Sequence, residues 1–232
     1  MKKILLFLLL NSLNSFSQSF DYKDYNSFLS KYVSNDGNVN YAKIKKNNSQ
    51  LDVVIAQFEK NQPSEKWLDY EKMAYYINVY NAYTIKVVID NYPTKSIKDI
   101  KNAWTKKIVP SGKSKISLSF IENKILRKMD DPRTHFAINC ASFSCPILSN
   151  KAYIPKTLDK QLDKAAKIFV KDKSKNDITA DEIKISKIFN WYSSDFKSSD
   201  KNIVNYINKY SKTKINAAAK ISYLDYDWSL NQ

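Results

Sequence analysis

The chain has 232 residues and carries 38 Lys and Arg residues against 23 Asp and Glu residues, a formal net charge of +15. It contains only two glycines, two cysteines and one histidine. Gly37 and Gly112 are too far apart to form the glycine-rich phosphate-binding loop of P-loop or Rossmann proteins, and a single histidine excludes metal sites that need two. With 43% hydrophobic residues, the chain is expected to fold as one domain.

The first residues have the layout of a secretory signal peptide. Two lysines follow the initial methionine, an apolar stretch runs from Ile4 to Leu10, and small polar residues come next. The apolar stretch is too short to span a bilayer. We therefore expect residues 1–18 to be a signal peptide, and residues 19–232 to be a single exported domain. This domain would be periplasmic or extracellular, and soluble after the signal is cleaved.

The excess of positive charge is spread along the chain, mostly as lysine. A basic balance of this size fits either a polyanionic partner or a solvated surface. The even spread favours the solvated surface, so we expect no nucleic-acid partner. No later segment approaches 18 apolar residues, so we expect no transmembrane segment. The basic surface could still contact anionic polymers of the cell envelope, and the expected ligand is a small molecule or peptide.

The hydrophobic pattern predicts helices and short strands in an irregular order. Helices are expected over residues 20–33, 51–58, 64–91, 119–129, 157–170 and 202–210. Strands are expected near residues 39–44, 116–118, 134–139, 178–185 and 221–226, the fourth of these as a hairpin. Ser119 and Glu122 have the spacing of a helix-capping box. This order predicts an α+β fold, a single domain with a buried central helix, 64–91, packed against a small mixed or antiparallel sheet.

The rarest residues of the chain meet in the segment 131–146, which holds the histidine, both cysteines and one of the two arginines. One interpretation is a thiol nucleophile, Cys145, with His135 as its base and Asn139 orienting the imidazole. On a strand, alternation would place Cys140 on the face opposite His135. Cys145 is therefore the favoured nucleophile.

Two other arrangements of this segment compete with the first. A disulfide between Cys140 and Cys145 is favoured by an oxidising, exported setting, and it would exclude thiol catalysis until it is reduced. A metal site would use His135, both cysteines and a carboxylate such as Asp131, but the spacing is loose for zinc. We expect no metal and no other cofactor. A purely structural role for all three side chains remains the simplest alternative.

Other polar residues are candidates for binding substrate. Asn78 and Asn81 lie three apart on the central helix, where asparagine is a poor helix former, and a buried amide must bond either to backbone or to a ligand. Asn78 is a candidate donor to an oxyanion. Arg133 is a candidate for holding a carboxylate or phosphate. Three further residues could wall a pocket or simply pack in the core: Trp191, Tyr192 and Asp195.

Several segments together resemble one protein family. The segments that carry the resemblance are Tyr76–Ala82, Ile121–Arg127, Asp131–Pro146, Ile188–Phe196 and Tyr226–Asn231. They are similar to the bacterial, secreted branch of the domain of unknown function 547, most strongly over about residues 65–150. This resemblance implies no settled activity.

Two functional hypotheses follow. The chain is either an exported cysteine-dependent hydrolase or acyl-transfer enzyme acting on an amide or ester, or a non-catalytic exported binding module. In the second hypothesis, a disulfide between Cys140 and Cys145 shapes the recognition loop.

Overall fold

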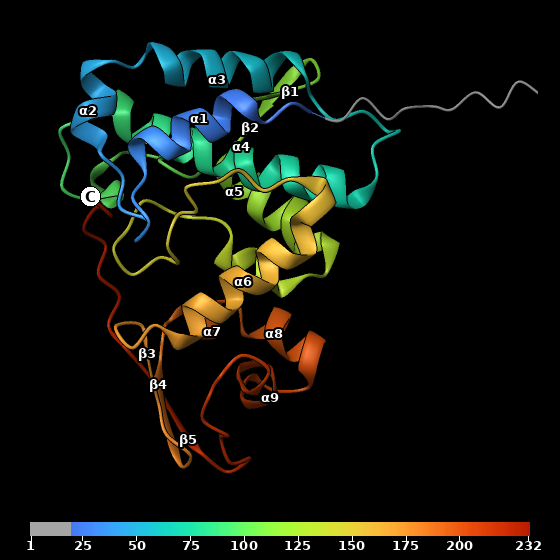
Figure 1. Ribbon diagram of the computed structural model, residues 1–232, viewed down its shortest axis with the longest axis vertical. Coiled ribbons are helices and arrows are strands. Elements are labelled where there is room, and N and C mark those ends of the chain that lie inside the picture. Colours follow the sequence, from blue (N-terminus) through green and yellow to red (C-terminus); the bar gives the residue numbers. More distant parts are fainter. Residues whose placement is uncertain (1–19) are drawn as a thin grey trace, which may run out of the picture.

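The computed structural model describes residues 20–232, so the predicted signal peptide, 1–18, lies outside the described residues. In the described part, helices and short strands are mixed along the chain (Figure 1), and the predicted α+β class is confirmed. No helix between residues 20 and 232 combines the length and the apolar character needed to cross a bilayer.

The helices of the described chain differ widely in length. The α-helices are α1 (Lys23–Tyr32), α2 (Tyr41–Lys46), α3 (Ser49–Lys60), α4 (Asp69–Asp90), α5 (Leu118–Phe120), α6 (Leu158–Lys171), α7 (Ile188–Trp191), α8 (Ser193–Asp200) and α9 (Ile203–Asn208). Single helical turns are η1 (Ile97–Asp99), η2 (Ile121–Ile125), η3 (Leu126–Met129), η4 (Pro132–Phe136) and η5 (Pro155–Thr157). The structure confirms helices at the predicted positions of α1, α3, α4, α6 and α9.

The central helix, α4, is buried on nearly all of its faces from Ala74 to Ile89. It packs against α2, α3 and the helical turns of residues 118–129. It ends just before Tyr92 and Pro93, as expected because the residue before a proline disfavours the helical conformation. The predicted buried central helix is confirmed, and its neighbours are mostly other helices.

The strands form two small sheets. The strands are β1 (Val109–Ser111), β2 (Ser114–Ile116), β3 (Asn176–Ile178), β4 (Glu182–Ile185) and β5 (Lys220–Tyr223). β1 and β2 form an antiparallel hairpin. The second sheet is mixed, because β4 pairs antiparallel with β3 and parallel with β5. The hairpin predicted at residues 178–185 corresponds to β3 and β4.

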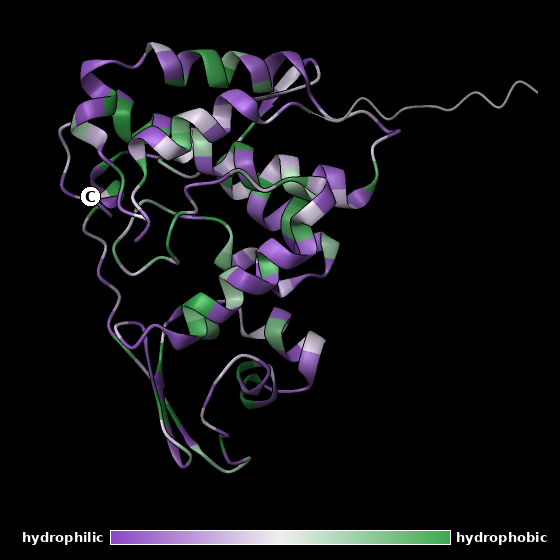
Figure 2. Ribbon diagram, in the orientation of Figure 1, coloured by the Kyte–Doolittle hydropathy of each residue, from purple (hydrophilic) through white to green (hydrophobic). Residues whose placement is uncertain are grey.

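Buried apolar side chains form two clusters, and the site lies where they meet. The first cluster surrounds α4, and the second joins α6, the three-stranded sheet and helices α7 to α9. Figure 2 shows hydrophobic and hydrophilic residues sharing α6, as expected for a helix with one buried face. Phe136 belongs to the second cluster and Ala137 to the first. The end of η4 therefore lies on the boundary between the two cores.

Two segments that were predicted as strands are helical. Residues 39–44 contribute a single bridge and then begin α2, which Asn40 caps. Residues 134–139 begin in η4, because Pro132 occupies the first turn and the side chain of Asp131 accepts a hydrogen bond from the backbone N–H of Arg133. The strand alternation that separated His135 from Cys140 therefore does not apply.

The C-terminal segment returns to the first core. After β5 the chain runs back along the molecule to end beside α2 (Figure 1). Isolated bridges join Ser229 to Ser96 and Leu230 to Ser142. The returning segment therefore lies against the loop of residues 139–146, on which the candidate site depends.

Candidate functional site

A cavity of ≈ 300 Å³ opens where the two cores meet. This volume is at the small end of the range for small-molecule sites. His135, Cys140 and Cys145 all line it. The structure therefore brings together the three rare side chains that the sequence singled out.

His135 is buried and held by a charged pair. Its Nε2 atom lies 2.8 Å from Oδ2 of Asp195. Arg127 donates two hydrogen bonds to the same carboxylate, from Nε to Oδ2 at 2.7 Å and from Nη2 to Oδ1 at 2.8 Å. Asp195 therefore occupies the position next to the imidazole that the sequence assigned to Asn139.

The charge on Asp195 determines which imidazole nitrogen is available. Burial alone would raise the pKa of Asp195, but the hydrogen bonds from Arg127 and His135 outweigh it and hold this pKa well below its usual range. The anionic carboxylate accepts a hydrogen bond, so Nε2 of a neutral His135 carries the proton. Nδ1, which has no hydrogen-bond partner among residues 20–232, is then the basic nitrogen.

Glu122 brings a second acidic group to the cavity. Its carboxyl accepts a short hydrogen bond from the hydroxyl of Tyr192 and a longer one, 3.4 Å, from Tyr80. The ring of Tyr192 also stacks on His135, with the centroids 3.9 Å apart. Burial, reinforced by the nearby Glu122, raises the pKa of Tyr192 and keeps its hydroxyl protonated as a donor. A single aromatic ring therefore links Glu122 to the imidazole.

The capping box predicted from Ser119 and Glu122 is wrong. The residue that caps α5 is Ser117, whose side chain accepts from the N–H of Phe120. The chain then widens into the π-helical turn η2, which includes Glu122. Such turns are frequent at functional sites. Glu122 is therefore free of a capping role and joins the cavity lining instead.

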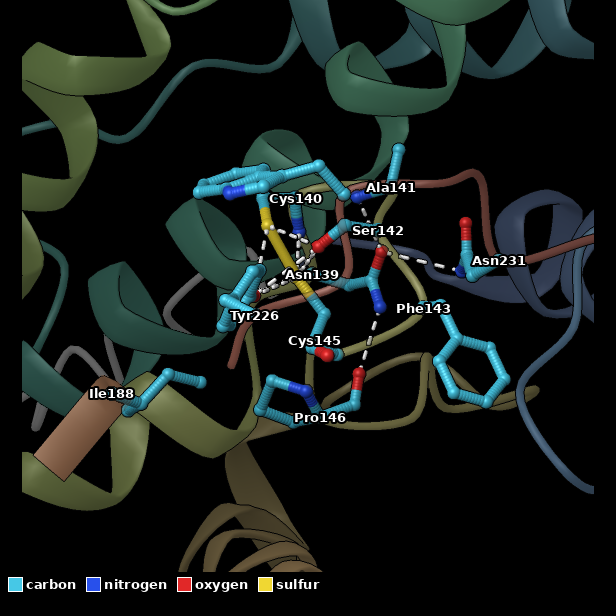
Figure 3. The surroundings of a disulfide bond; sticks show 12 residues. Asn139, Cys140, Ala141, Ser142, Phe143, Cys145, Pro146, Ile188, Tyr226 and Asn231 are labelled. Carbon is cyan, nitrogen blue, oxygen red and sulfur yellow. Dashed lines mark hydrogen bonds between the residues drawn. A yellow bond between two sulfur atoms is a disulfide. The ribbon is translucent and has the colours of Figure 1, made fainter. Parts of the chain in front are cut away.

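Cys140 and Cys145 are joined in a disulfide (Figure 3), one of the arrangements that the sequence left open. Three groups surround Sγ of Cys145: the backbone N–H of Cys140 at 3.0 Å, and the hydroxyls of Ser142 and Tyr226, each at 3.2 Å. Burial raises the pKa of Tyr226 to about 12, so its hydroxyl retains the proton it donates. The same two hydroxyls also lie 3.2 and 3.5 Å from Sγ of Cys140, so the backbone N–H is the contact that distinguishes Cys145.

Asn139 holds the loop rather than the imidazole. Its side-chain amide donates to the carbonyl of Pro146 at 2.7 Å, and its oxygen accepts from the N–H of Ala141 at 2.7 Å (Figure 3). The side chain of Asn231 lies against the same oxygen at 3.4 Å. These bonds close the loop on itself and tie it to the C-terminal segment.

Asn78 and Asn81 also bond to backbone. The side chain of Asn78 both donates to the carbonyl and accepts from the N–H of Tyr153. Asn81 donates to the carbonyl of Ala137 at 2.9 Å and accepts from the N–H of Asn139 at 2.8 Å. Neither asparagine lines the cavity. Both side chains therefore bond to backbone rather than to a ligand, which was one of the two possibilities for a buried amide. Asn81 also fixes the start of the disulfide loop.

Arg133 lies outside the cavity of His135. It forms ion pairs with Asp131 at 2.7 Å and with Asp159 at 2.9 Å, and it lines a separate cavity of ≈ 710 Å³. The structure therefore does not bring Arg133 together with the other predicted site residues. The other arginine of the chain, Arg127, is the one that serves His135.

The metal arrangement has no geometric basis in the described chain. Between residues 20 and 232, no group of three or more His, Cys, Asp or Glu side chains is placed to hold an ion. The carboxylate suggested as a ligand, Asp131, is paired with Arg133.

The sequence did not identify Asp195 or Tyr226 as partners of the rare residues. Asp195 is 60 residues from His135 in the sequence and reaches it from α8. Tyr226 reaches Cys145 from the C-terminal segment. Both lie in segments that carried the family resemblance, which was the only sequence signal that could have connected them to the site.

Comparison with known proteins finds a family match for the central part of the chain. No curated protein matches the chain, and neither does any solved structure. The family model described as "Protein of unknown function, DUF547" matches residues 64–170, from just before α4 to the end of α6. This segment, which includes His135 and the disulfide loop, is similar to the DUF547 family.

Proposed function

We propose that the protein is a cysteine-dependent hydrolase or acyl-transfer enzyme acting on an amide or ester. The observation that carries the proposal is the convergence of three hydrogen-bond donors on Sγ of Cys145, in a cavity that His135 also lines. Donors that point at a sulfur stabilise its thiolate and lower its pKa. Among the described residues, a backbone N–H donates to the sulfur of Cys145 and none to that of Cys140, so Cys145 is the proposed nucleophile.

His135 is the proposed acid and base. Asp195 holds the proton on Nε2 and leaves Nδ1 free to take or return another. The side chain of Asp195 is itself fixed by two bonds from Arg127. This is the arrangement of a nucleophile, a base and an orienting acid, in which the third member fixes the tautomer of the second.

The reaction would proceed through a thioester. The thiolate of Cys145 attacks the carbonyl carbon, and the π electron pair moves onto the oxygen. As the tetrahedral intermediate collapses, the amine or alcohol leaves with a proton from the His135 imidazolium. A water molecule or acceptor alcohol then gives a proton to His135, attacks the thioester and releases the thiolate.

The proposed nucleophile is available only after the disulfide is reduced. An external dithiol would supply the two electrons and two protons that convert the Cys140–Cys145 bond into two thiols. The proposal therefore predicts activity in the reduced protein and none in the oxidised protein.

The test compares two single substitutions with and without dithiothreitol, using para-nitrophenyl esters as probes. Cys140→Ser leaves Cys145 unable to form the disulfide, so this variant should hydrolyse the ester without reductant. Cys145→Ser should be inactive under both conditions. Activity retained in Cys145→Ser, or absent from both the Cys140→Ser variant and the reduced wild type, would reject the proposal.

A second candidate function is a non-catalytic binding module. The disulfide favours it, because the bond closes the loop of residues 140–145 beside the cavity. In this case the oxidised protein binds its ligand and reduction weakens the binding. The ester assay separates the two candidates, because a binding module shows no turnover in either redox state.

Export is part of the same proposal. The pattern of residues 1–18 supports it, and a disulfide is expected to persist outside the reducing cytosol. Sequencing the N-terminus of protein recovered from outside the cytoplasm should find a mature chain that begins near Ser19. An uncleaved chain confined to the cytoplasm would reject this part.

A further inference from the structure

The charge of the cavity differs from that of the whole chain. The chain has 38 Lys and Arg residues, yet none of them belongs to the cavity lining among the described residues. In the described part of the chain, Glu122 is the one carboxylic acid that lines the cavity. In a protein of net charge +15, a pocket without a cation and with a buried acid is not expected to attract anions.

Aromatic rings form the wall of the same cavity. Trp191 and Trp228 stack with centroids 5.8 Å apart, and Tyr226 lies 4.6 Å from Trp228. Trp104 meets Trp228 edge to face at 5.9 Å. The faces of such rings attract ammonium groups, and several rings grouped together form the usual site for an organic cation.

One cation already lies against this wall. Nζ of Lys98 is 5.4 Å from the ring centroid of Trp228, although Lys98 is not part of the cavity lining. A second positive group, Arg127, lies 5.4 Å from the ring of Tyr192, which also lines the cavity. Its charge is balanced by the bidentate pair with Asp195. Within residues 20–232, the hydrogen-bond partners of the Glu122 carboxyl are the neutral hydroxyls of Tyr80 and Tyr192.

From these observations we infer that the cavity selects a ligand with a positively charged ammonium group, which binds between Glu122 and the tryptophan wall. If the proposed function holds, the substrate is an ammonium-bearing amide or ester whose carbonyl lies at Cys145. The volume of ≈ 300 Å³ limits the bound part to a small molecule or a single side chain. The inference about binding applies equally to the oxidised protein.

The binding test uses three probes of nearly equal size and different charge: benzylamine, benzyl alcohol and benzoate. Each is titrated at neutral pH into the oxidised protein, and tryptophan fluorescence reports binding, because three of the four tryptophans line the cavity. We expect benzylamine to bind about tenfold more tightly than benzyl alcohol and benzoate to bind most weakly. Equal affinities, or the tightest binding for benzoate, would overturn the inference.

A matched pair of variants assigns the preference to one side chain. Glu122→Gln keeps the shape and can still accept from Tyr192, so it should fold while reducing the preference for benzylamine to about twofold or less. Glu65→Gln removes an exposed carboxylate that is not part of the lining, and it should leave the preference unchanged. Thermal unfolding of both variants verifies that they are folded. A preference that survives in folded Glu122→Gln would overturn the assignment.

An ester hydrolysis assay tests this inference separately from the proposed function. Reduced protein is given the para-nitrophenyl esters of N-acetyl-lysine and N-acetyl-norleucine, which differ in the terminal ammonium. A kcat/KM about tenfold higher for the lysine ester supports both ideas. Equal hydrolysis of the two esters rejects the inference and keeps the hydrolase. No hydrolysis, together with selective benzylamine binding, rejects the hydrolase and keeps the cation site.

Discussion

Two sets of polar side chains, buried or half-buried, bond to different partners. Asn78 and Asn81, on α4, bond to backbone groups. On the cavity side, His135, Asp195 and Glu122 bond to other side chains. Backbone partners are fixed by the fold itself, whereas side chains around a cavity can exchange a partner for a ligand. The nature of the partner therefore separates polar groups that hold the fold from those available for chemistry.

The largest effects are expected from substitutions of His135 and Asp195, the polar side chains at the cavity. His135→Gln removes the proposed base, and Asp195→Asn presents an amide that no longer fixes the tautomer of His135. We expect ester hydrolysis by the reduced protein to fall by about 10³- to 10⁴-fold in each, with the fold retained. The measurement is kcat/KM with a para-nitrophenyl ester as a function of pH.

The matched control for this prediction is Asp225→Asn, which alters an exposed carboxylate on the C-terminal side of β5. Its rate and pH profile should equal those of the wild type. If Asp195→Asn also had the rate and pH profile of the wild type, the pair of Asp195 with His135 would be structural. The polar groups of the cavity would then have no catalytic role.

Substitution of a buried asparagine that bonds to backbone should lower the free energy of unfolding. Asn81→Ala leaves the buried carbonyl of Ala137 and the N–H of Asn139 without their partner. We expect the free energy of unfolding to fall by about 2–3 kcal/mol, measured by urea denaturation. Asn61→Ala, at an exposed amide, should change it by about 0.5 kcal/mol or less. Equal losses in the two variants would contradict a special role for the buried amide.

The fold was predictable from sequence where local pattern and burial agree. α4 has apolar residues on nearly every face, and α6 has an apolar stripe, so both helices were found. Residues 134–139 have the composition of a buried strand, but Asp131 and Pro132 just before them start the helical turn η4. The local capping chemistry outweighs the strand-like composition there.

The site was predictable only in part. His135, Cys140 and Cys145 could be predicted as site residues because His and Cys are rare in this chain, and all three line one cavity. The orienting acid was missed because Asp195 reaches His135 across two elements that are distant in the sequence, η4 and α8. A sequence pattern relates only residues that are near each other in the chain, and it therefore favoured Asn139, four residues from His135, for this position. Contacts of this kind depend on how the two cores meet, which no local pattern encodes.

The two glycines of the chain offer a smaller test of how the loop after Cys145 is held. Both have positive φ, +79° for Gly37 and +57° for Gly112. A Cβ on Gly37 would lie 2.6 Å from Cβ of Ile147 and 2.7 Å from the backbone N of Leu148, whereas one on Gly112 would meet nothing within 4 Å. We expect Gly37→Ala to lower the free energy of unfolding by about 2 kcal/mol and Gly112→Ala by about 1 kcal/mol. Urea denaturation measures both, and equal losses would show that Gly37 does not constrain the loop.

The smallest expected effect concerns the pH dependence of stability. The pKa of Asp195 is lowered in the folded protein, because bonds from Arg127 and His135 outweigh its burial. A group of this kind stabilises the fold above its unfolded pKa of about 4, and the contribution is lost as the pH falls toward the folded pKa. Asp195→Asn should therefore be less stable than the wild type by about 1 kcal/mol at neutral pH.

The two stability curves should converge gradually as the pH falls from about 4 toward the lowered pKa of the folded protein. In this range the unfolded chain takes up a proton at Asp195 before the folded protein does, so the advantage of the charged carboxylate is lost. Urea denaturation at a series of pH values measures the difference. Asp225→Asn, whose side chain is fully exposed, should run parallel to the wild type throughout. A constant gap between Asp195→Asn and the wild type at every pH would mean that the loss comes from altered packing. In that case the carboxylate charge of Asp195 would contribute nothing to folding.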